Sequence, residues 1–169
     1  MEIENVVIVG SGFMGSGIAY VTAMAGVNVT LIDREQKFLD KAMSNLKEMI
    51  KEGISRGKMS AHQGQQLSER FNSSTDLAGA VKQADLIIEA VYEDMKLKKE
   101  IFSQLSTFAR SKAILVTNTS TLSNTKIAEG LSNPSRIAGL HFFSPVPAMK
   151  LVEIIKGVQT SDDTINTLS

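Results

Sequence analysis

Apolar runs separated by polar and glycine-rich segments indicate an alternation of strands and helices along the chain. Residues 4–9 predict a first strand, because their continuous β-branched run is typical of a strand buried on both faces. A helix is predicted over 14–25, ending at Gly26, where a left-handed C-cap fits. Residues 27–32 predict a second strand, with Asp33 at its carboxyl end.

A pair of helices is predicted directly after the second strand. Residues 36–52 are amphipathic, since their apolar positions recur at helical spacing and lysines occupy other positions. Two glycines interrupt this pattern, and Ser60 with Gln63 three residues later has the spacing of a capping box. We therefore interpret 36–70 as a helical hairpin inserted between strands.

Strands and helices alternate again over the rest of the chain. Helices are predicted over 76–83, 94–110 and 124–130, and from 162 after the cap at 161; strands are predicted over 86–91, 113–118, 137–143 and 151–155. Strands alternating with helices are typical of a mostly parallel sheet covered on both faces. The predicted fold class is α/β, a doubly wound Rossmann-type sheet with the inserted hairpin.

Length and composition narrow the range of possible functions. The 169 residues predict one domain, and an apolar fraction of 43% with a charged fraction of 21% is ordinary for a globular protein. Lys plus Arg and Asp plus Glu are 18 each, so the basic excess of a nucleic-acid binder is missing. Without cysteine there is no disulfide, thiolate metal ligand or cysteine nucleophile, and we predict no metal site. The acidic start and the lack of a run near ~20 apolar residues predict no signal peptide, no membrane partner and a cytoplasmic protein.

A glycine-rich turn follows the first strand. Gly10, Gly12 and Gly15 form G-x-G-x-x-G, and Asp33 comes about 20 residues later, as in dinucleotide-binding βαβ units. Gly10 would allow the tight turn, and Gly12 would let a pyrophosphate approach the helix N-terminus. Gly15 would permit close packing of the helix on the strand. From these residues alone, a turn without a ligand also remains open.

Asp33 bears on the choice of cofactor. Its carboxylate would accept hydrogen bonds from the adenine ribose hydroxyls and repel a 2′-phosphate, which favours NAD over NADP. The neighbouring Arg34 softens that preference. A phosphate loop of an NTPase would need lysine after the last glycine, and the chain has Ser16 there.

Further motifs lie toward the C-terminal end. They are His-Phe-Phe-Ser-Pro over 141–145, Leu-Val-Glu over 151–153, Asn-Thr-Ser over 118–120 and Glu-Ala-Val-Tyr-Glu over 89–93. With them the chain resembles the 3-hydroxyacyl-CoA dehydrogenases, including the 3-hydroxybutyryl-CoA dehydrogenases, over essentially its whole length.

The resemblance implies that His141 is the catalytic acid/base, that Glu153 pairs with it, and that Ser120 hydrogen-bonds the substrate's reacting oxygen. Imidazole exchanges protons near neutral pH, and a carboxylate on its second ring nitrogen fixes the tautomer. If the chain reverses over 145–147, His141 opposes Glu153 across an antiparallel pair, so the final strand is predicted to be antiparallel. Taken alone, the histidine could be structural and Ser120 could cap a helix.

The resemblance also implies NAD as cofactor and acyl-CoA as substrate. The expected cofactor contacts are Gly10, Gly12, Phe13, Met14, Gly15, Asp33, Val91, Glu93, Lys98, Ser120 and Ser144. Ser144 stands where the family often has asparagine. Arg56 and Lys58 of the hairpin, with Ser120, are the expected substrate contacts.

Family members continue into an all-helical second domain that carries the dimer interface. Residues 1–169 are therefore expected to be the dinucleotide-binding domain alone, weakly active, from an enzyme that is a homodimer through the missing domain. The implied pathway is fatty-acid β-oxidation or butyrate metabolism. Two other functions stay open: a dehydrogenase of a hydroxy acid without CoA, and a non-catalytic dinucleotide-binding protein.

Overall fold

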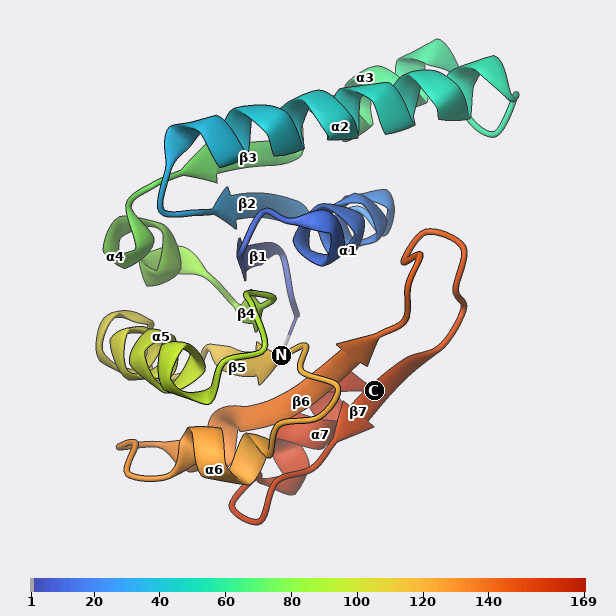
Figure 1. The fold of residues 1–169 in the computed structure, drawn as a ribbon. Helices are drawn as coiled ribbons and strands as arrows, with labels where there is room; N and C mark the ends of the chain where they lie inside the picture. Colours follow the sequence, from blue (N-terminus) through green and yellow to red (C-terminus); the bar gives the residue numbers. More distant parts are fainter. Residues whose placement is uncertain (1) are drawn as a thin grey trace.

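A single seven-stranded sheet organises the computed structural model, which describes residues 2–169 (Figure 1). Its strand order is β3-β2-β1-β4-β5-β6-β7, with β7 antiparallel to β6 and every other neighbouring pair parallel. The strands are β1 (Asn5–Val9), β2 (Asn28–Ile32), β3 (Phe71–Ser74), β4 (Leu86–Glu89), β5 (Ile114–Thr117), β6 (Ile137–Phe142) and β7 (Val152–Ile155). The predicted α/β class and the antiparallel final strand are confirmed.

Helices cover both faces of this sheet. They are α1 (Phe13–Met24), α2 (Gln36–Ser55), α3 (Ala61–Ser68), α4 (Leu77–Ala80), α5 (Met95–Phe108), α6 (Asn124–Ala128) and α7 (Asp162–Leu168), with 3-10 turns η1 (Val81–Gln83) and η2 (Pro134–Arg136). Alternate residues of β1 enter two separate cores: Ile8 packs with α1 and α2, and Val7 packs with α5. In the described part of the chain, none of the helices has the length and apolar character needed to cross a membrane.

The predicted helical hairpin is present as α2 and α3, and Ser60 and Gln63 make the capping box. β3 follows the hairpin and forms one edge of the sheet, and no strand was predicted there from the sequence. Only Phe71 of this strand is buried, and it pairs with Val29 of β2. The remaining Asn-Ser-Ser residues have low strand propensity, so backbone pairing rather than side-chain pattern makes this element.

Strand order and register position the site. The order reverses between β1 and β4, and ligands of doubly wound sheets bind at the carboxyl ends of the strands beside such a point. In the β6–β7 pair, His141 lies opposite Glu153, as predicted. The loop between these strands packs on α1, because Val146 is buried and a Cβ built on Gly17 would lie 3.0 Å from the Val146 Cβ.

Candidate functional site

The glycine turn between β1 and α1 leaves an open space at Gly12. Gly10 has a φ of +104°, a left-handed value that favours glycine, and a Cβ there would lie 2.6 Å from the Ala90 oxygen. A Cβ on Gly15 would lie 1.8 Å from the Gly10 oxygen, so this glycine packs on the turn more closely than on the strand. A Cβ on Gly12 would meet nothing within 4 Å, so space outside the turn is free.

The first turn of α1 is suited to an anion. Gly12 is the N-cap and supplies no side-chain cap, and this turn has no acidic residue. The free N–H groups and the positive end of the helix dipole therefore face the open space. In space and charge, this turn fits the diphosphate of NAD.

Asp33 is held beside the turn by three hydrogen bonds. Its Oδ2 accepts from the backbone N–H of Ser11 at 2.9 Å and from the Ser11 hydroxyl at 2.7 Å, and its Oδ1 accepts from the N–H of Arg34 at 2.8 Å. The carboxylate is thus fixed at the carboxyl end of β2, where the ribose of a dinucleotide would reach it. No role was predicted for Ser11 from the sequence. The Arg34 side chain is exposed and lies 3.5 Å from Glu35.

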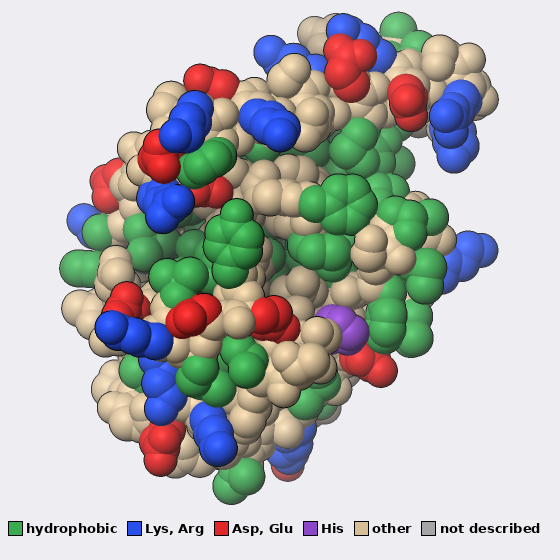
Figure 2. All heavy atoms as spheres, viewed as in Figure 1, with side chains coloured by type: hydrophobic (Ala, Val, Ile, Leu, Met, Phe, Trp, Pro, Cys, Tyr) green, Lys and Arg blue, Asp and Glu red, His purple; other side chains and the backbone are tan. Residues whose placement is uncertain are grey.

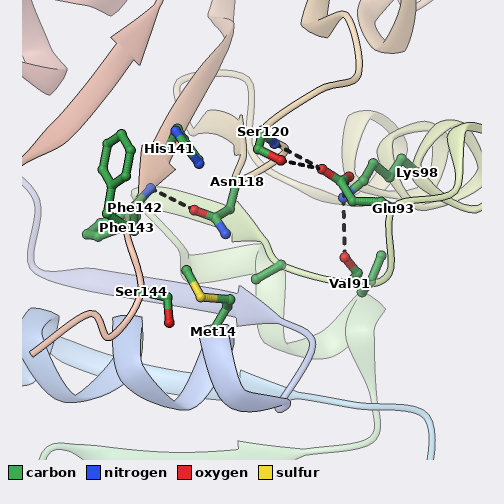
Figure 3. A pocket seen from close by; sticks show the side chains of 11 residues that line it. Met14, Val91, Glu93, Lys98, Asn118, Ser120, His141, Phe142, Phe143 and Ser144 are labelled. Atoms are coloured by element: carbon green, nitrogen blue, oxygen red, sulfur yellow. Dashed lines mark hydrogen bonds and ion pairs between the residues drawn. The ribbon is translucent and has the colours of Figure 1, made fainter.

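A pocket of about 280 Å³ lies at the carboxyl ends of β4, β5 and β6 (Figure 3). Its lining includes seven of the predicted site residues: Met14, Val91, Glu93, Lys98, Ser120, His141 and Ser144. Four lining residues had no predicted role: Ala90, Asn118, Phe142 and Phe143. Asn118 fixes the strand beside the histidine, because its Oδ1 accepts from the Phe142 N–H at 2.8 Å.

His141 and Glu153 form the predicted pair. The His141 Nδ1 lies 2.9 Å from the Glu153 Oε2, and the histidine side chain is 17% exposed. The Phe143 ring packs against the imidazole with a centroid distance of 4.5 Å and an interplanar angle of 55°. With Nδ1 engaged by a carboxylate, Nε2 is the ring nitrogen left to exchange a proton in the pocket.

Ser120 is fixed by Glu93 rather than by a helix. The Ser120 N–H donates to the Glu93 Oε1 at 2.9 Å, and the Thr119 hydroxyl donates to the same oxygen at 2.7 Å. Partial burial would raise the pKa of Glu93, but these bonds and the charge of Lys98 outweigh it and hold that pKa below its usual value. The N-cap of α6 is Ser123, so a capping role for Ser120 is wrong.

A buried ion pair lies behind Glu93. Lys98 and Glu89 are 1% and 0% exposed, and the Lys98 Nζ lies 2.7 Å from the Glu89 Oε1 and 3.4 Å from the Glu93 Oε2. Glu89 also accepts from the Val91 N–H at 2.8 Å and the Thr117 hydroxyl at 2.7 Å. No role was predicted for Glu89, although an acidic residue directly after a buried apolar run is a signal that the sequence contains.

Comparison with known proteins agrees with this geometry. The family "3-hydroxyacyl-CoA dehydrogenase, NAD binding domain" matches residues 5–169. The chain belongs to this family. Its cofactor is therefore NAD, which fits the turn, the helix end and the carboxylate described above.

Similar proteins cover nearly the whole chain. A probable 3-hydroxyacyl-CoA dehydrogenase of Caenorhabditis elegans is 43% identical over 99% of the chain, and the mouse mitochondrial hydroxyacyl-coenzyme A dehydrogenase is 40% identical over 98%. The crystal structure of 3-hydroxybutyryl-CoA dehydrogenase from Escherichia coli has a TM-score of 0.97 at 38% identity, covering 99% of this chain and 35% of that one. The chain spans 57% of the C. elegans relative and 54% of the mouse relative.

The two basic residues predicted to contact the substrate lie apart from the pocket. Arg56 and Lys58 lie where α2 ends and the hairpin turns, and this end projects from the molecule (Figure 1). Arg56 is 3.7 Å from Glu52 of its own helix. On the visible face, basic and acidic side chains are interspersed (Figure 2). Substrate contact by this pair stays a prediction.

Proposed function

We propose that the chain is the cofactor-binding part of an enzyme that interconverts (S)-3-hydroxyacyl-CoA and 3-oxoacyl-CoA with NAD. The observation that carries this proposal is the His141–Glu153 pair at 2.9 Å, in register across β6 and β7 at the edge of the pocket. A dinucleotide-binding protein without catalysis has no need of a histidine oriented in this way. Family membership supports the acyl-CoA class of substrate.

The residues divide the reaction between them. Glu153 holds His141 with Nδ1 protonated, so that Nε2 can take the proton of the 3-hydroxyl group. Ser120 lies on the same pocket, where its hydroxyl can hydrogen-bond the reacting oxygen. When bound, NAD supplies the hydride acceptor, so a secondary alcohol and NAD⁺ give a ketone, NADH and one proton. In the reverse direction His141 returns its proton to the oxygen.

We also propose that the whole protein carries a second, helical domain through which it dimerises, and that this chain alone turns over weakly. The chain covers about half of the length of its relatives, which supports the proposal of a further domain. Fatty-acid β-oxidation or butyrate metabolism is the corresponding pathway.

The test is reduction of acetoacetyl-CoA by NADH under single-turnover conditions, with the chain in excess. His141→Asn should reduce the rate by about 10²-fold or more, and Glu153→Gln by less, while both variants keep NADH binding. Free acetoacetate is the matched substrate without CoA. Equal rates for the two substrates would favour the dehydrogenase without CoA. A rate unchanged in His141→Asn would refute the proposed acid/base.

A further inference from the structure

The carboxylates in and directly behind the pocket wall outnumber the ammonium groups there. Apart from His141, the charged side chains of its lining are Glu93 and Lys98, which taken together are neutral. Lys98 is already paired with Glu89, which lies behind it and is completely buried. Its contact with Glu89 is the shorter one, 2.7 Å against 3.4 Å to Glu93. Two carboxylates therefore share one ammonium group.

We propose that Glu89, Lys98 and Glu93 together present one net negative charge to the nicotinamide end of the cofactor and so set the relative affinity for NAD⁺ and NADH. The inference rests on the proposed function for the placement of the nicotinamide. The oxidised ring carries a positive charge that the reduced ring lacks. A negative cluster stabilises the first and not the second, so it raises the affinity for NAD⁺ relative to NADH.

The fold directs the nicotinamide toward this cluster. Asp33 lies after β2 and the open glycine turn lies after β1, which accounts for the ribose and the diphosphate. A dinucleotide extended from there crosses the switch point to the ends of β4, β5 and β6. Figure 3 shows Glu93 and Lys98 on one side of the pocket, His141 on the other and Ser120 between them, so the nicotinamide and the substrate would meet between the two sides.

Glu89 is the residue that makes the cluster negative. Without its charge, Lys98 would neutralise Glu93 and the pocket wall would carry no net charge. Burial increases the effect, because water does not screen a pair that is 0% and 1% exposed. Glu89 does not line the pocket and is also anchored by Thr117 and Val91, so it acts through Lys98. It is a positioning and charge-setting residue rather than a catalytic one.

The test measures dissociation constants of NAD⁺ and NADH for the 169-residue chain and its variants, NADH by fluorescence titration and NAD⁺ by competition against it. In Glu89→Gln and Glu93→Gln, the ratio of the NAD⁺ constant to the NADH constant should rise roughly tenfold, the order expected for one partly screened charge. Glu89→Asp keeps the charge and is the matched control. Thr117→Val removes one bond to Glu89 without changing charge. Both controls should keep the ratio of the unaltered chain even where both affinities fall.

The outcomes distinguish failure of the proposed charge cluster from failure of the proposed function. A ratio within twofold of the unaltered chain in both glutamine variants would refute the charge cluster and leave the dehydrogenase function standing. A rise in Glu93→Gln alone would refute the role of Glu89. An equal rise in Glu89→Asp would show that geometry and not charge sets the ratio. If the folded, unaltered chain bound neither nucleotide, the cofactor site and the inference would both fail.

Discussion

Replacing Gly15 by alanine should damage both the fold and the cofactor site. The added Cβ would lie 1.8 Å from the Gly10 oxygen, well inside the 3.0 Å that real Cβ atoms essentially never pass. The atom it meets is backbone and cannot rotate away, so the turn or the helix must shift by more than an ångström. Overpacking typically lowers the free energy of unfolding by about 1–3 kcal/mol, and we expect a clash with the backbone to lower it by about 3 kcal/mol. For a chain of this size that lowers Tm by about 6–12 °C.

Gly12→Ala is the matched variant, because its Cβ meets nothing within 4 Å. An alanine N-cap costs roughly 0.5–1 kcal/mol relative to glycine, so Tm should fall only a few degrees. The same Cβ fills the space that a diphosphate would occupy, and NADH affinity should drop about tenfold or more. Thermal unfolding by circular dichroism and NADH fluorescence titration measure the two effects. Equal loss of Tm in both variants, or full NADH affinity in Gly12→Ala, would contradict this account of the turn.

Three other changes test separate parts of the structure. Arg136→Met should lower the free energy of unfolding in urea by about 2–3 kcal/mol, because the buried guanidinium donates to three backbone carbonyls; a loss under about 0.5 kcal/mol would contradict this. Asp33→Asn should weaken NADH binding about tenfold while NADPH binding holds or improves, and parallel losses would argue against selection by charge. Because the pKa of Glu93 lies below its usual value, its carboxylate stabilises the fold at pH values above the ordinary pKa of a glutamate, and this stability is lost as the pH falls through the lower pKa of the folded state. The Tm difference between the unaltered chain and Glu93→Gln should accordingly be present at neutral pH and disappear in acid, and a constant difference would refute it.

Hydrophobic pattern predicted the interior of the fold well and its edge poorly. The β1 residues 6–9 and the β4 residues 86–88 are continuous apolar runs because helices cover both faces of these strands, and such runs stand out in a sequence. β3 lies at the sheet edge with one buried side chain, so its polar residues look like a loop. Its position is fixed by backbone pairing with β2, which leaves no trace in residue types.

Some residues of the candidate site could be predicted from the sequence and others could not. The register of His141 and Glu153 followed from a chain reversal centred midway between them, a local relation that spacing can express. Glu89 was missed because its partner Lys98 comes from the next helix, and only packing shows that the two side chains meet away from water. Ser11 was missed for a related reason, since it lies in the turn after β1 and holds Asp33 at the end of the neighbouring strand β2.

The contact between Gly17 and Val146 limits how parts of this fold can be exchanged between relatives. A chimera that carries only the β6–β7 hairpin from another protein brings a foreign side chain at 146 onto a helix fitted to valine. Since a Cβ built on Gly17 would lie only 3.0 Å from the Val146 Cβ, a larger residue at either position would push the β6–β7 loop and α1 apart. The segment that can be transplanted intact is therefore the hairpin together with the first helix, although more than a hundred residues separate them in the chain.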